Sequence, residues 1–160
     1  MYIGNLGDAE AVLARKKDPK DPIPTAELLT FKHKPNDPDE RKRIEEAGGH
    51  VVFGRVLGSL AVSRAFGDSE FKVPRNRQKT HFVSNDPFLK VVDIDPNVPF
   101  MVIACDGLWD KVTYQDAVNF IAQRHKAKVS PKEAAQQLVE KAIKDGTLDN
   151  VSVIIVYFSW

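Results

Sequence analysis

The chain has 160 residues, of which 42% are hydrophobic and 28% charged, a composition typical of ordinary globular domains. Its formal net charge of +1 and its scattered basic residues argue against nucleic-acid and membrane partners. No apolar run approaches the length of a membrane span. The single cysteine excludes an intrachain disulfide. We therefore expect a protein of a reducing compartment, cytoplasmic or nuclear.

The N-terminal segment predicts a β-hairpin followed by a loop. Two short apolar runs, residues 2–6 and 11–14, are separated by the turn-forming pair Gly7-Asp8. Residues 16–24 are polar and rich in proline, which favours a loop. Because the chain does not open with the charged and apolar regions of a signal peptide, we expect it to enter in the middle of a fold.

A helix is predicted from Pro38 onwards. Asp37 can cap its first turn, Pro38 suits the first helical position, and Gly48-Gly49 ends it. Its clear apolar contacts are Ile44 and Ala47, so we expect it at the surface.

The segment after this helix is predicted from composition. We expect a short strand over residues 51–56, irregular chain over 57–71 and a basic loop over 75–80.

The C-terminal half alternates apolar strands with amphipathic helices. Strands are predicted over 88–94 and 100–105, helices over 114–125 and 131–144, and a central strand over 151–158. Thr113 and Ser130 can cap the two helices. Strands followed by helices and a final strand indicate an α+β fold with mostly antiparallel sheets.

Four aspartates stand at the ends of the predicted strands. Asp8 ends the first strand, Asp106 follows the buried strand, Asp110 comes four residues later, and Asp149 precedes the last strand. Carboxylates at the ends of rigid strands are well placed to hold a hard cation. Asp-Gly and Asp-Asn pairs also form turns, so the pattern alone leaves both interpretations open.

Rival chemistries receive less support. Cysteine-dependent phosphatases need an arginine six residues after the cysteine, but Lys111 stands there, so Cys105 is interpreted as a small buried hydrophobe. Ser63 lacks a nucleophile-elbow motif. The histidines show no zinc-like spacing; His125 fits the negative end of a helix, and only His33 is kept as a candidate.

Five segments, in order, resemble the protein phosphatase 2C family. Residues 5–13 (NLGDAEAVL) resemble its N-x-GDSRAVL hairpin, and 29–49 (LTFKHKP through AGG) resemble its LTxDHKP…AGG flap. Residues 55–68 (RVLGSLAVSRAFGD) resemble RVxGxLAVSRAFGD, 104–110 (ACDGLWD) match the family motif, and 146–156 (GTLDNVSVIIV) resemble GSxDNxSVIVV. One motif would be weak evidence, whereas five in order make chance a poor explanation.

The resemblance implies an antiparallel β-sandwich flanked by helices, with two or more Mn²⁺ or Mg²⁺ ions at one end. It implies that Asp106 and Asp149 ligate metal, while Asp8 and Asp110 help form a weaker site. A metal-bridging water would hydrolyse phosphoserine or phosphothreonine in a protein substrate. Residues 33–58, from His33 to beyond Arg55, would form a flap subdomain beside the substrate.

Two departures from the family pattern shape the functional expectation. Ala9-Glu10 replaces a serine-arginine pair, which changes the charge beside Asp8. No Asp-Gly-His motif occurs, so the family's N-terminal ligands are expected to be missing. We therefore expect weak metal binding, little activity, and dimerisation or pairing with an N-terminal half. The alternative is a truncated, non-catalytic phosphatase-like interaction module.

Overall fold

The computed structural model describes residues 1–72 and 81–160 and divides into two compact units. Unit 1 comprises Met1–Ile3, Ala9–Thr30 and Lys90–Trp160, and unit 2 comprises Gly4–Asp8 and Phe31–Leu89. The basic loop predicted at 75–80 lies outside the described residues. Within the described part of the chain, every helix is too short or too polar to cross a membrane.

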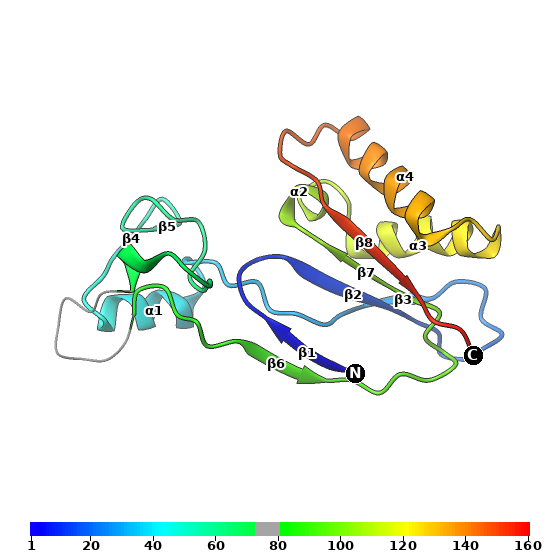
Figure 1. Cartoon of the computed structure of the whole chain (residues 1–160), viewed down its shortest axis with the longest axis horizontal. Coiled ribbons are helices and arrows are strands. Elements are labelled where there is room, and N and C mark those ends of the chain that lie inside the picture. Colours follow the sequence, from blue (N-terminus) through cyan, green and yellow to red (C-terminus); the bar gives the residue numbers. More distant parts are fainter. Residues whose placement is uncertain (73–80) are drawn as a thin grey trace. The chain divides into compact units, whose positions relative to one another are not determined.

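Unit 1 is built on a four-stranded antiparallel sheet with the order β3-β2-β7-β8 (Figure 1). Its strands are β2 (Glu10–Arg15), β3 (Thr25–Leu28), β7 (Phe100–Ala104) and β8 (Val153–Tyr157). In this register Val102 of β7 lies opposite Val12 on one side and Ile155 on the other. Side chains of these three residues therefore share one face of the sheet.

Three helices cover that face: α2 (Asp106–Trp109), α3 (Tyr114–Lys126) and α4 (Pro131–Lys144) (Figure 1). The caps predicted from the sequence are confirmed, since Thr113 accepts from the Asp116 N–H and Ser130 from the Glu133 N–H. Burial of each large apolar side chain here contributes about 1.5–3 kcal/mol. The largest fully buried members of this core are Phe100, Leu108, Ile121 and Leu138.

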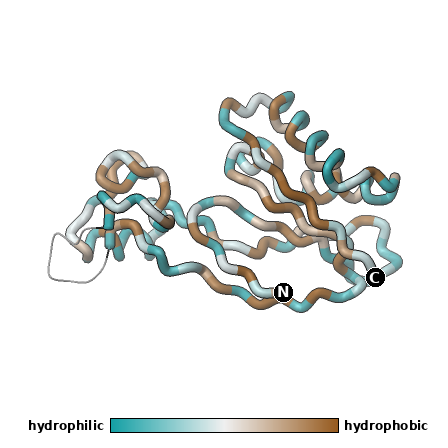
Figure 2. Tube along the Cα trace, in the orientation of Figure 1, coloured by the Kyte–Doolittle hydropathy of each residue, from teal (hydrophilic) through white to brown (hydrophobic). Residues whose placement is uncertain are grey.

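The opposite face of the sheet carries a second apolar cluster. Leu13 and Met101 pack there against Val92 and Val98. Hydropathy is high along both β7 and β8 in Figure 2. The prediction that the last strand is central is wrong for the described chain, because β8 lies at the sheet edge. Composition indicates only that a strand is apolar, and an apolar strand can occupy an edge.

The predicted N-terminal hairpin is also wrong. β1 (Tyr2–Asn5) pairs with β6 (Phe88–Val91), a strand distant in sequence, while β2 pairs with β3 and β7. The intervening Gly7 carbonyl accepts from the His33 backbone N–H instead of closing a hairpin. Long-range pairing of this kind leaves no local signal in the turn residues. The α+β class with antiparallel sheets is confirmed.

Unit 2 contains α1 (Pro38–Glu46), the short strands β4 (Val51–Val52) and β5 (Arg55–Val56), and a 3₁₀ turn, η1 (Ser69–Phe71). The predicted strand at 51–56 is thus two strands joined by a tight turn at Phe53-Gly54, where both φ angles are positive. Residues 57–71 are otherwise irregular, as expected.

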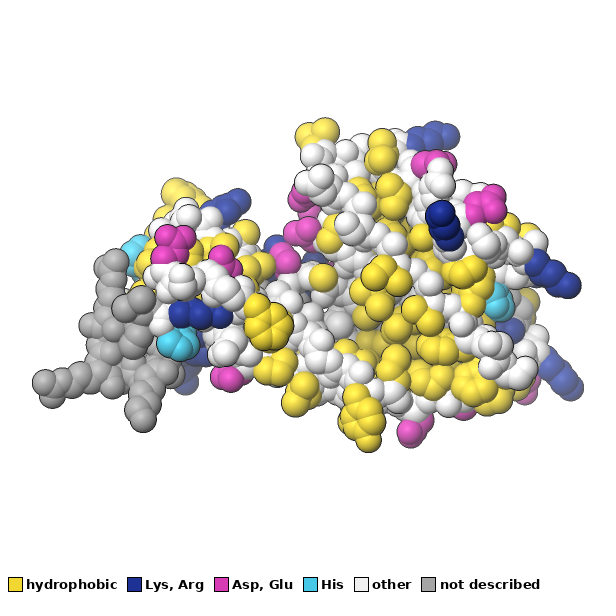
Figure 3. Space-filling view, viewed as in Figure 1, with side chains coloured by type: hydrophobic (Ala, Val, Ile, Leu, Met, Phe, Trp, Pro, Cys, Tyr) yellow, Lys and Arg dark blue, Asp and Glu magenta, His cyan; other side chains and the backbone are white. Residues whose placement is uncertain are grey.

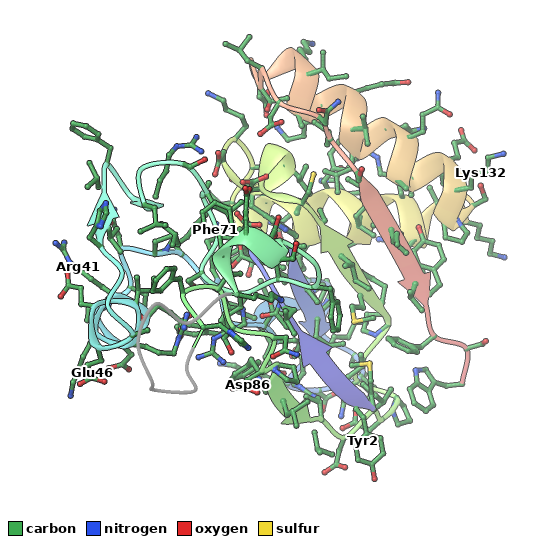
Figure 4. The ribbon with its side chains drawn as sticks, turned by 60° about the vertical axis from the view of Figure 1, so that its left-hand side comes forward. Tyr2, Arg41, Glu46, Phe71, Asp86 and Lys132 are labelled. Atoms are coloured by element: carbon green, nitrogen blue, oxygen red, sulfur yellow. The ribbon has the colours of Figure 1, made fainter. Side chains whose placement is uncertain are left out.

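The N-terminal cap and the exposed face of helix α1 agree with the sequence prediction of a surface helix. Asp37 caps it, and Arg41 and Glu46 project outward from it (Figure 4). Ile44 and Ala47 are fully buried against the cluster that includes Phe82.

A buried carboxylate was not predicted on this surface helix. Glu40 is only 2% exposed, and its oxygens accept hydrogen bonds from Arg43 at 3.0 Å and from Arg64 at 2.5–3.0 Å. Arg43 also donates to the carbonyls of Ser63 and His81. Burial alone would raise the pKa of Glu40, but the two guanidinium groups outweigh it and lower that pKa from 4.5 to about 2. Glu40 thus joins α1 to the chain around residues 63 and 81.

Candidate metal centre

Pairing between β7 and β8 brings two of the predicted metal ligands to the same end of the sheet. Ala104 lies opposite Val153, so Asp106 and Asp149 extend from neighbouring strand ends. Cys105 continues the pairing, with its N–H donating to the Ser152 carbonyl at 3.2 Å. These backbone bonds set the spacing of the two aspartate segments.

Gly107 makes the approach of these segments very close. A Cβ atom at Gly107 would lie 2.2 Å from the Asn150 carbonyl oxygen and 3.4 Å from the Asp149 Cβ. Carbon and oxygen atoms that are not bonded do not approach so closely, so this contact requires glycine. The Asp106-Gly107 and Asp149-Asn150 pairs are therefore in direct contact.

Asp110 completes this end of unit 1. Its N–H donates to the Asp106 carbonyl at 2.8 Å, closing the single turn of α2. Trp109 anchors that turn, because its buried indole N–H donates to the Ala104 carbonyl at 3.0 Å. Asp110 and Asp149 both line an open cavity of about 540 Å³. Three of the four predicted aspartates thus lie at one end of unit 1.

The donors at this end suit a hard divalent cation in kind, since Mn²⁺ and Mg²⁺ prefer carboxylate and carbonyl oxygens. They do not suit it in placement. Within residues 1–72 and 81–160 no group of three or more histidine, cysteine, aspartate or glutamate side chains converges well enough to hold a metal ion. As candidate ligands, Asp106, Asp110 and Asp149 would therefore need further groups to hold a cation.

Asp8, the fourth predicted aspartate, belongs to unit 2, where its carboxylate forms an ion pair with the Lys34 ammonium group. The turn before it is fixed by His33, which is 1% exposed and whose backbone N–H and Nδ1 both lie 3.0 Å from the Gly7 carbonyl oxygen. Burial lowers the pKa of His33, so a neutral ring with Nδ1 as donor fits this contact. His33 thus positions the turn that presents Asp8.

We predict that Lys34→Met strengthens cation binding at Asp8, because in the wild-type chain the lysine ammonium group is paired with the Asp8 carboxylate. The pair is partly exposed and worth up to about 1 kcal/mol, so affinity for Mn²⁺ should rise by up to about fivefold. Isothermal titration calorimetry measures the change, with Lys42→Met on the exposed face of α1 as the control. Equal affinities in both variants would contradict a competition between Lys34 and the cation.

Arg55, the other flap residue predicted from the sequence, lies in β5 of unit 2. It is exposed, and its Nη1 donates to the Ser59 carbonyl at 2.7 Å. This bond holds the guanidinium group against the turn that follows β5, so the structure gives Arg55 a local structural contact.

Glu10, one of the two residues that depart from the family pattern beside Asp8, is buried in unit 1. Glu10 is 2% exposed and accepts a hydrogen bond of 2.7 Å from the Tyr114 hydroxyl inside unit 1. Burial and the Glu10 charge raise the pKa of Tyr114 to about 12, so the hydroxyl remains a donor at neutral pH. The carboxylate is therefore engaged with α3.

One further sequence interpretation changes, that of Cys105 as a buried hydrophobe. Cys105 is half-buried and hydrogen-bonded: its Sγ donates to the Asn150 carbonyl and accepts from the Ser152 N–H, both at 3.2 Å. His125 lies in the last turn of α3, where the sequence placed it, and packs edge-on against Tyr157 at 4.6 Å between ring centroids; burial lowers its pKa. Ser63 is fully buried, as its structural interpretation requires.

Comparisons with known proteins cover nearly the whole chain. The protein phosphatase 2C family model matches residues 1–151. The chain is 40% identical to protein spalten of Dictyostelium discoideum over 100% of its own length, and 38% identical to protein phosphatase 2C homolog 2 of Schizosaccharomyces pombe over 99%. A crystal structure of a phosphatase from Toxoplasma gondii matches 98% of the chain with a TM-score of 0.83 and 31% identity.

Each of these proteins is much longer than the 160-residue chain. The chain spans 16% of spalten, 43% of the fission-yeast phosphatase and 47% of the Toxoplasma structure. The similarity therefore covers nearly all of this chain but less than half of each relative.

Proposed function

Because the chain belongs to the protein phosphatase 2C family, we propose that it forms part of the catalytic centre of a metal-dependent phosphatase that acts on phosphoserine and phosphothreonine in proteins. The observation that carries this proposal is the contact between the Asp106-Gly107 and Asp149-Asn150 pairs at the end of β7 and β8. Two carboxylates held by paired strands are suited to a shared cation.

In this proposal Asp106 and Asp149 are the principal metal ligands, and Asp110 and Asp8 contribute to a weaker site. Bound Mn²⁺ or Mg²⁺ would lower the pKa of a coordinated water and offset charge on the phosphoryl oxygens. The protein's own contribution is to fix its carboxylates before substrate arrives, through the β7–β8 pairing and the buried Trp109 bond.

We further propose that the 160-residue chain alone binds metal weakly and turns over substrate slowly or not at all. Within the described residues no group of three carboxylates converges well enough to hold an Mg²⁺ or Mn²⁺ ion, so further ligands are needed. The fission-yeast phosphatase and the Toxoplasma structure are more than twice as long as the chain, which leaves room for further ligands outside the matched region. The second candidate function, a non-catalytic interaction module, follows if such ligands are never supplied.

We predict that hydrolysis of p-nitrophenyl phosphate by the chain, with Mn²⁺ titrated in, is close to background. Any Mn²⁺-dependent turnover should fall by more than about 100-fold in Asp106→Asn, because even outer-shell partners of metal ligands contribute about 10- to 100-fold. Asp93→Asn is the matched control, because Asp93 is exposed and is not one of the three aspartates at the end of β7 and β8. Robust turnover by the folded chain would refute the incomplete centre, and turnover unaffected by Asp106→Asn would refute the role of Asp106.

The edge of the sheet supports the proposed pairing with a second chain. β8 is the outermost strand, and Ile154 on it is 60% exposed. Figure 3 shows hydrophobic side chains gathered over the part of unit 1 that the helices leave uncovered. An exposed apolar edge strand is a template for pairing with another strand. We propose that two copies of the isolated chain pair through β8.

We predict that light scattering detects a dimer of the wild-type chain at high concentration and a monomer of Ile154→Lys. A charge on the edge strand blocks edge-to-edge pairing without removing a buried contact. Leu89→Lys, at another exposed apolar position, is the control and should remain dimeric. A monomeric wild-type chain would contradict the proposed pairing.

A further inference from the structure

A second cavity lies in unit 1 at the end of the sheet opposite the aspartates. It has a volume of about 440 Å³ and is lined by the loop after β2, the start of β7 and the last turns of α3. Phe100 begins β7 at this cavity, whereas Asp106 follows the far end of the same strand. Five residues of extended strand separate the two ends by roughly 17 Å.

Positive charge gathers around this cavity. Lys16, Lys20 and Lys126 line it, and their ammonium groups outnumber the one carboxylate in the lining, that of Asp21. Dark-blue side chains lie along the right-hand edge of Figure 3, over the end of α3 and the loop after β2. The Lys16 ammonium group donates to the Pro19 carbonyl at 3.2 Å, and Lys16 lines the cavity together with His125.

The walls of the cavity are held in place before any ligand arrives. Gln115 of α3 donates to the Pro24 carbonyl at 3.1 Å and accepts from the Ala26 N–H at 3.0 Å, which ties the loop to the helix. The Lys16 N–H donates to the Asn97 carbonyl at 2.9 Å. The His125 ring is fixed between Phe100 and Tyr157. A preformed pocket with an apolar floor and a few convergent polar groups is typical of a ligand site.

An apolar cavity of about 330 Å³ continues from the first one. The two share Pro22, Ala122 and Lys126, and Ile23, which is 63% exposed, lines the second. A ligand that fills both must therefore combine negative charge with an apolar group a few ångströms away. A short acidic peptide with an aliphatic side chain has this combination, whereas a free small anion lacks the apolar part.

We propose that the lysine-rimmed cavity is a docking site for an acidic, leucine-containing peptide segment of a protein partner. The carboxylates of the segment pair with Lys16, Lys20 and Lys126, and its aliphatic side chain occupies the adjoining cavity beside Ile23. The site is remote from the aspartate cluster and does not depend on metal. It would engage a partner while the other end of the sheet remains accessible.

Fluorescence anisotropy of a fluorescein-labelled peptide of alternating glutamate and leucine tests the proposal on the full chain. The triple variant Lys16→Gln, Lys20→Gln, Lys126→Gln should bind on the order of tenfold more weakly, because each partly exposed ion pair contributes about twofold and at most about fivefold. A matched triple variant, Lys42→Gln, Lys132→Gln, Lys144→Gln, removes the same charge from exposed helix positions and should bind as the wild type does.

Asp21→Asn supplies an independent readout, since loss of the one carboxylate in the lining should strengthen binding by about twofold. Absence of measurable binding, or equal weakening in both triple variants, would overturn the proposal. So would equally strong competition by a single-stranded oligonucleotide, because it would show attraction to any polyanion. Circular dichroism verifies that each variant is folded.

Discussion

Replacing Glu40 by glutamine is expected to destabilise unit 2 by about 3 kcal/mol, the lower end of the range for breaking a buried ion pair. The carboxylate is 2% exposed and is shared by Arg43 and Arg64, which are themselves about a quarter exposed. Glutamine keeps the shape but leaves two guanidinium groups without their counter-charge. Urea unfolding and hydrogen exchange over the described residues of unit 2 measure the loss.

The control for this variant lies on the same helix. Glu45 pairs with Arg41 at 2.8 Å, but both side chains are about half exposed, so Glu45→Gln should change stability by less than about 0.5 kcal/mol. Equal effects of the two substitutions would show that burial of the ion pairs of Glu40 with Arg43 and Arg64 contributes nothing to the free energy of unfolding.

The same carboxylate predicts a loss of stability in acid. The pKa of Glu40 is about 2 in the folded chain against 4.5 when unfolded, so below pH 4.5 the unfolded state binds a proton that the folded state does not. Its contribution, on the order of 3 kcal/mol, is complete above pH 4.5 and declines as pH falls towards 2. In Glu40→Gln this part of the acid dependence should disappear.

Gly107→Ala is expected to disrupt the candidate metal centre and to cost about 3 kcal/mol of stability, the upper end of the usual range for overpacking. The added Cβ would lie 2.2 Å from a backbone oxygen, which cannot rotate away as a flexible side chain could. The Asp149-Asn150 segment must therefore move from Asp106. The midpoint temperature of thermal unfolding and the affinity for Mn²⁺ should both be lower than in the wild type.

Gly4→Ala provides the comparison, because its Cβ would meet only Leu89 Cδ2 at 3.7 Å, an ordinary contact. It should leave Mn²⁺ affinity unchanged. A Gly107→Ala chain that unfolds at the wild-type temperature and binds Mn²⁺ as well would contradict the close packing of the two aspartate segments.

Local chemistry in the sequence predicted the elements whose stability is decided locally. Asp37, Thr113 and Ser130 each cap the helix that they were expected to cap, because a cap needs only residues within one turn. The partner of β1 and the edge position of β8 were missed, because pairing between distant strands depends on the whole topology.

The candidate site was likewise predicted only in part from the sequence. Asp106 and Asp149 were expected together from their places beside apolar strands, and the β7–β8 register brings their segments into contact. The ion pair of Asp8 with Lys34 and the burial of Glu40 were not predicted. The sequence does not show which distant residue a charged side chain will contact. A Glu-x-x-Arg spacing on α1 was the one available signal for the Glu40–Arg43 contact.

Electron paramagnetic resonance of Mn²⁺ titrated into the chain tests whether the end of β7 and β8 binds metal, because it counts bound ions without requiring activity. We predict weak Mn²⁺ binding that is lost in Asp106→Asn and in Asp149→Asn but retained in Asp93→Asn. Binding that is unchanged in the first two variants would contradict the assignment of the end of β7 and β8 as a metal centre.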